Sequence, residues 1–119
     1  MDMNVRSVLM EGGVNVDELL ERCMGSEALL ARLLKKFPLD SSFAGLEDAF
    51  RKSDETAALE ASHTLKGVCG NLSLTGLFTV LDRQVQLLRS HDMSGAASIM
   101  PEISRQYYTA IQSIEKAFG

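Results

Sequence analysis

The sequence contains no tryptophan, only two prolines, only two cysteines and no long apolar run. With so few prolines, the chain has room for several long helices. No apolar run approaches the roughly 18–20 residues that span a bilayer, and the N-terminus does not resemble a signal peptide. Cys23 and Cys69 form no CxxC pair, so we expect two buried thiols in a reducing cytoplasm.

The chain also lacks the concentrated positive charge of a nucleic-acid-binding protein. Its 119 residues carry a net charge of −4, and lysine and arginine are not gathered in any one stretch. This distribution argues against binding to a phosphate backbone. No Ser-His-Asp grouping, P-loop or metal-ligand cluster is visible, so we expect no metal site, no cofactor and no autonomous catalytic turnover.

What the chain does have is a succession of helical apolar patterns, without any strand alternation or repeat. We interpret residues 1–14, which end in Gly12-Gly13, as a flexible lead-in or linker. Residues 15–119 then form one helical domain. The fold class we predict is all-α: an up-and-down four-helix bundle with a short extra N-terminal helix.

Polar residues and prolines mark the expected helix ends. Asn15 is placed to cap the short first helix, with Glu18 at the reciprocal position of a capping box. Pro38 should stop or kink the next helix, and Pro101 should kink the last one or break it after Met100. Further N-caps are expected at Ser26, at Ser53 or Asp54, and at Ser94.

The most informative stretch is the helix that contains His63. On a helical wheel its apolar residues fall within one narrow arc, which predicts the face turned to the core. His63 lies almost opposite that arc and should be exposed. The arc is formed by Ala58, Ala61, Leu65, Val68 and Leu72.

The residues around His63 favour a docking surface. Gly67 and Gly70 lie on the same outer side of the helix, where each glycine costs about 0.5–1 kcal/mol relative to alanine. Their missing side chains would let a bulky partner approach the imidazole, and Leu59 adds an apolar contact one turn earlier. Close packing against a neighbouring helix is the alternative explanation for the glycines. We expect structural burial alone for Cys69, which lies near the core arc.

The chemistry of the group fits phosphoryl transfer. An ordinary imidazole has a pKa of about 6.5 and is mostly neutral and nucleophilic at neutral pH. Phosphorylation adds up to about two negative charges. Lys66 follows His63 by three residues on a neighbouring ridge, so its ammonium could hold phosphoryl oxygens.

The run His63-Thr-Leu-Lys-Gly-Val-Cys-Gly-Asn-Leu72 closely resembles the HxLKGxxxNxG-like signature of the histidine-containing phosphotransfer (HPt) family of two-component phosphorelays. The resemblance covers about residues 15–118. Ser73 departs from it, because the family often has glycine there, and this could alter the turn into the following helix.

The resemblance implies that His63 is phosphorylated by the aspartyl phosphate of a response-regulator receiver domain and passes the group to another receiver. Lys66 would then stabilise the phosphate, and Gly67 would give the receiver access. A polar residue of the following helix, Gln84 or Gln86, would support the site. The protein would be a cytoplasmic monomer, with Mg²⁺ on the partner receiver and a hybrid histidine kinase as a further possible partner.

Two other functions remain open at this point. The bundle could dock a receiver without being phosphorylated, although binding alone would not need the histidine. It could also be the phosphoacceptor domain of a chemotaxis-type histidine kinase, which would require a kinase domain elsewhere in the same protein.

Overall fold

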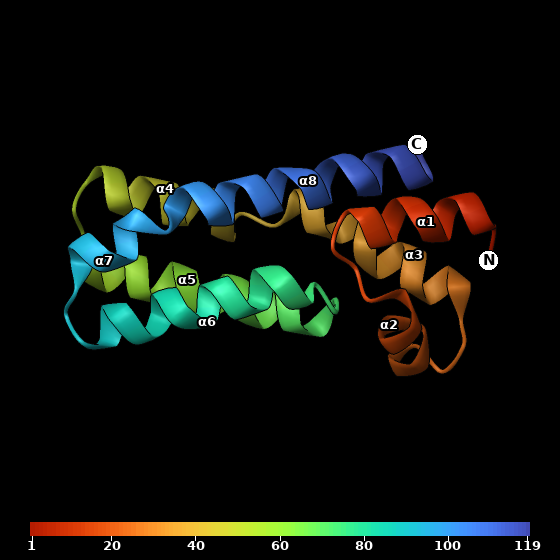
Figure 1. Cartoon of the computed structure of the whole chain (residues 1–119), viewed down its shortest axis with the longest axis horizontal. Helices are drawn as coiled ribbons and strands as arrows, with labels where there is room; N and C mark the ends of the chain where they lie inside the picture. Colours follow the sequence, from red (N-terminus) through yellow and green to blue (C-terminus); the bar gives the residue numbers. More distant parts are fainter.

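In a computed structural model, which describes all 119 residues, every regular element is a helix (Figure 1). A single isolated bridge between Val14 and Leu74 is the only β-type pairing. The prediction of an all-α fold is therefore confirmed. The elements are α1 (Met3–Glu11), α2 (Val16–Arg22), α3 (Glu27–Lys36), the 3-10 helix η1 (Phe37–Leu39), α4 (Ser42–Arg51), α5 (Glu55–Asn71), α6 (Thr75–Arg89), α7 (Met93–Ser98) and α8 (Met100–Phe118).

The molecule is elongated, with principal extents of 44 × 23 × 19 Å. Helices α4, α5, α6 and α8 follow the long axis, and α5 packs against both α4 and α6 (Figure 1). Helices α1 and α3 pack along α8, and both chain ends lie at the same end of the molecule. No helix combines the length and the apolar character that crossing a membrane requires.

The helix starts follow local capping chemistry. The side chains of Asn15, Ser26 and Asp54 each accept a hydrogen bond from a backbone N–H in the first turn of α2, α3 and α5. These three predicted caps are confirmed. The capping box is half right, because the Glu18 carboxylate accepts a hydrogen bond from the Ser73 hydroxyl at 2.8 Å instead of reaching back to Asn15.

The C-terminal helix boundaries differ from the prediction. Ser94 is not a cap, because Asp92 caps α7 by accepting from the backbone N–H of Gly95 at 2.8 Å. The break falls at Ile99, before Met100 and not after it. Pro101 then lies in the first turn of α8, where its missing N–H has no helical partner to lose.

Residues 3–11 form α1, so the expectation of a flexible lead-in over residues 1–14 is wrong for this stretch. Asp2 caps the helix, and Val8 and Leu9 are buried. Gly12, which we assigned to a linker, is itself buried where α1 ends against α8. Val5, Val8 and Leu9 recur at helical spacing in this stretch, and Val8 and Leu9 are the residues of α1 that are buried.

The core side of α5 is rotated slightly from the predicted arc. Ala58, Leu65 and Leu72 are buried as expected, whereas Ala61 and Val68 are only half-buried. Ser62 and Cys69 are fully buried in their place. A wheel drawn from apolar residues alone misplaces this face, because it leaves out a serine whose hydroxyl is satisfied in the interior.

Replacing Gly12 with alanine should destabilise the protein. An ideal Cβ at this position would lie 1.8 Å from Ser113 Oγ and 2.4 Å from Ser113 Cβ on α8. Overpacking of this kind costs about 1–3 kcal/mol, which urea unfolding would measure. Gly45→Ala on α4 is the matched control, because its Cβ would meet only Ala61 Cβ at 4.0 Å. Equal stability of the two variants would mean that α1 is not packed on α8.

Candidate functional site

His63 lies in the middle of α5 with its imidazole exposed to solvent. Its side chain forms no hydrogen bond and no ion pair within the chain. The buried residues Ser62 and Leu65 lie on the other side of the helix. The ring is therefore held on a rigid element and is free to meet a partner molecule.

Lys66 is not a free cation beside the imidazole. Its ammonium lies 3.3 Å from Asp82 Oδ1 on α6 and 5.9 Å from the centre of the Phe78 ring. Only 17% of its side chain is exposed. Sequence analysis missed both partners, because the pattern of α5 carries no information about which residues of α6 lie opposite.

The two glycines have different surroundings. A Cβ added at Gly67 would meet nothing within 4 Å, whereas one at Gly70 would lie 3.2 Å from the Phe78 ring. The Phe78 ring gives Gly70 a packing role, as the alternative explanation required, but Gly70 also lines the open groove described below, so its docking role stays a prediction. Gly67 is exposed and has no packing role, so the surface next to His63 is bare at this one position.

Leu59 is half-buried and packs against a small apolar cluster between α4, α5, α6 and α7. Part of its surface is therefore used inside the protein, and the remaining part borders the His63 face. The cluster consists of Ala49, Ala58, Leu88 and Ala96.

The two glutamines of α6 also differ. Gln84 is completely buried: it accepts from the Ser62 hydroxyl at 2.8 Å and donates to the Ala96 carbonyl at 3.0 Å. Because its amide is engaged inside, Gln84 does not support the His63 face directly, contrary to one of the two predictions. Gln86 is exposed and lies one turn beyond Asp82 on the same side of α6.

Ser73 lies in the turn between α5 and α6, at the position where the family signature often has glycine. The turn forms in spite of this difference. Ser73 adopts a left-handed backbone conformation with φ of 54°, which usually favours glycine. Its hydroxyl donates to Glu18, and its carbonyl accepts from the backbone N–H of Asn15 at 2.8 Å. These two contacts from the start of α2 hold the serine in this conformation.

A groove of about 560 Å³ begins one turn beyond His63. It extends from Gly67 past the 38% exposed ring of Phe78 to Arg22 on α2. The Arg22 guanidinium donates to the Gly70 carbonyl at 3.0 Å and pairs with Glu18. The groove is thus a concave surface that begins at Gly67, close to the histidine.

Cys69 cannot act as a nucleophile in this structure. Burial, with a smaller contribution from the negative charge of Asp40, raises the pKa of its thiol to about 12, so the reactive thiolate is absent at neutral pH. No group of three or more His, Cys, Asp or Glu side chains is placed to hold a metal ion.

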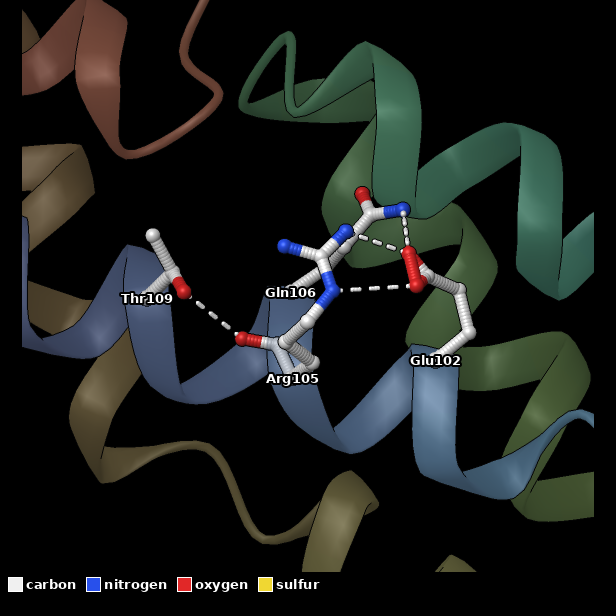
Figure 2. A network of polar contacts seen from close by, with 4 residues as sticks. All are labelled: Glu102, Arg105, Gln106 and Thr109. Carbon is white, nitrogen blue, oxygen red and sulfur yellow. Dashed lines mark hydrogen bonds and ion pairs between the residues drawn. The ribbon is translucent and has the colours of Figure 1, made fainter.

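A second polar network, formed by Glu102, Arg105, Gln106 and Thr109, lies on α8 (Figure 2). Hydrogen bonds from Arg105, and then from Gln106, hold the pKa of the Glu102 carboxyl below its usual value. Thr109 donates to the Arg105 carbonyl at 2.8 Å. Gln106 also limits the space at Gly76 of α6, where an added Cβ would lie 2.8 Å from its Oε1. We interpret the network as a structural contact between α8 and α6.

The other histidine, His91, has a different setting. It lies just after α6, and its Nδ1 is 2.5 Å from Glu55 Oε1 at the start of α5. The contact joins the C-terminal end of α6 to the N-terminal end of α5. His91 therefore serves as an internal comparison for His63, because it is exposed but already engaged.

Comparison of the chain with known protein families, with curated proteins and with solved structures finds no match. The residues of this site and the motif that contains His63 are therefore the only indications of function.

The two glycines of α5 predict opposite responses to alanine. Gly67→Ala should stabilise the protein by about 0.5–1 kcal/mol, because helix propensity improves and nothing is displaced. Gly70→Ala should lose this gain, since the Phe78 ring must move. Thermal and urea unfolding of both variants would measure the difference. A Gly70→Ala variant as stable as Gly67→Ala would contradict the packing role of Gly70.

Proposed function

We propose that this protein is a phosphocarrier of the histidine-containing phosphotransfer type, which accepts a phosphoryl group on His63 from one receiver domain and passes it to another. The observation that carries the proposal is the exposed, unpartnered imidazole in the middle of α5, next to the bare position Gly67. The arrangement of α4, α5, α6 and α8 supports an up-and-down four-helix bundle, to which α1, α2 and α3 are added.

The transfer is a displacement at phosphorus. The ring nitrogen of His63 that carries no proton attacks the aspartyl phosphate of the donor receiver. The N–P bond forms while the P–O bond breaks, and the electron pair of that bond stays on the donor carboxylate. The imidazole then carries the phosphoryl group on one nitrogen and a proton on the other. The second transfer reverses these steps toward the aspartate of another receiver.

The chain's own residues bind and orient the reacting groups. Lys66 can stabilise the phosphoryl oxygens from its ridge of α5, with a side chain long enough to turn from Asp82 toward His63. Gln86 is the polar residue of α6 that we assign to support. The receiver would dock over Gly67 and the exposed part of Leu59.

Most of the catalysis would come from the partner, which supplies the activated aspartyl phosphate and Mg²⁺. The protein would therefore act as a two-component signalling intermediate without turnover of its own. We propose that it works as a cytoplasmic monomer, since the resemblance to the HPt family implies this.

One observation favours a second function, a binding module that docks a receiver and is not phosphorylated. Lys66 pairs with Asp82 in the structure and forms no hydrogen bond with the imidazole. In that case the groove between Gly67 and Arg22 would be the important surface. Phosphorylation of His63 separates the two functions.

His63→Gln should abolish phosphorylation by a phosphorylated receiver, and His91→Gln should leave it unchanged. The two substitutions remove the only two histidines of the chain one at a time. Intact-mass analysis after incubation with a panel of phosphorylated receivers would detect an acid-labile adduct, and circular dichroism would check the helicity. An adduct that persists in His63→Gln would show that the site is wrong. Failure of the wild-type chain with every receiver, beside a working control carrier, would favour the binding module.

A large side chain at Gly67 should block the receiver without harming the fold. Gly67→Gln adds a good helix former where a Cβ meets nothing, so the protein should be at least as stable while the transfer rate falls about tenfold or more. Gly45→Gln, at an exposed glycine of α4, is the control. Unchanged transfer by Gly67→Gln in rapid-quench kinetics would exclude this position from the docking surface.

A further inference from the structure

The contact between Lys66 and Asp82 bears on how tightly a phosphoryl group would be held. Side chains on a helix lean toward its N-terminus, so the stem of Lys66 leans toward the turn that contains His63. Its ammonium nevertheless ends on α6, 3.3 Å from Asp82 Oδ1 and over the Phe78 ring. The lysine is thus held by an acidic partner in the unphosphorylated protein.

The contact between Lys66 and Asp82 is weak enough for Lys66 to exchange Asp82 for a phosphoryl group on His63. The Asp82 carboxylate is 47% exposed, and ion pairs with exposed partners are weak because water competes for both charges. A phosphoryl group with about two negative charges on His63 would compete for the same ammonium. Asp82 would then reduce the attraction between Lys66 and the phosphoryl group without removing it.

We propose that Asp82 is a positioning residue for Lys66 and keeps the phosphoryl group on His63 transferable. The inference rests on the proposed phosphocarrier function. A carrier must release its phosphoryl group as readily as it accepts it. A Lys66 ammonium that interacted with the phosphoryl group alone would favour the phosphorylated form. Because Asp82 also attracts the ammonium, it shifts the phosphotransfer equilibrium toward the phosphorylated receiver.

The test is the phosphotransfer equilibrium between this chain and a receiver that phosphorylates it. Asp82→Asn should raise the ratio of phosphorylated carrier to phosphorylated receiver by about two- to fivefold, the size expected of a partly exposed charge pair. Asp82→Glu, which keeps the charge, should restore most of the wild-type ratio. Asp17→Asn is the control, because it removes the same charge from an ion pair with Arg6 on other helices.

A double-mutant cycle shows whether Asp82 acts through Lys66. In a Lys66→Met background, whose side chain can still cover Phe78, Asp82→Asn should have little further effect. An undiminished effect there would overturn the positioning role, since Asp82 would then act directly on the phosphoryl group.

The same experiment separates this inference from the proposed function. A wild-type chain that is phosphorylated, with an unchanged ratio in Asp82→Asn, overturns the role of Asp82 alone. A wild-type chain that no receiver phosphorylates, beside a working control carrier, overturns the phosphocarrier function and this inference with it.

Discussion

The buried hydrogen bond between Ser62 and Gln84 fixes how α5 and α6 lie against each other. The serine hydroxyl donates to the glutamine amide oxygen, and the amide nitrogen donates in turn to the Ala96 carbonyl. No buried side-chain polar atom is left without a partner. A slip of one turn between the helices would break this pairing, and an unsatisfied buried amide is costly. This register places Lys66 opposite Asp82. It also leaves His63 on the outer side of α5.

The two sides of α5 serve different needs. The inner side contributes Leu65 and Cys69, both fully buried, to an apolar core shared with α6 and α8. The outer side carries His63 and Gly67, which contribute nothing to packing. The exposed glycine lowers the helix propensity of this side, and the core compensates for the loss. A rigid scaffold thus holds an uncrowded surface in place, which is what the proposed group transfer to a receiver would require.

Local rules predicted much of this arrangement. Capping chemistry gave the starts of three helices, and the 3.6-residue period placed His63 outside. What local rules missed depends on contacts between helices. The burial of Gln84 and the engagement of Lys66 by Asp82 follow from the register of α6, which no pattern within α5 contains. The docking of α1 depends on the space that α8 leaves at Gly12. Phosphorylation of His63 stays a prediction.

The bracing of Ser73 by Glu18 links residues that are 55 positions apart in the chain. The contacts between α5 and α6, in contrast, join helices that are neighbours in the chain, and the short loop between them costs little entropy to close. The pairing of these two helices therefore does not depend on the N-terminal helices. Local opening of α2 would release Ser73 from its left-handed conformation and loosen the adjacent end of the groove. The Ser62–Gln84 pairing beneath His63 would persist. The end of the groove at Glu18, Arg22 and Ser73 thus depends on α2, whereas the position of the histidine depends on the pairing of α5 with α6.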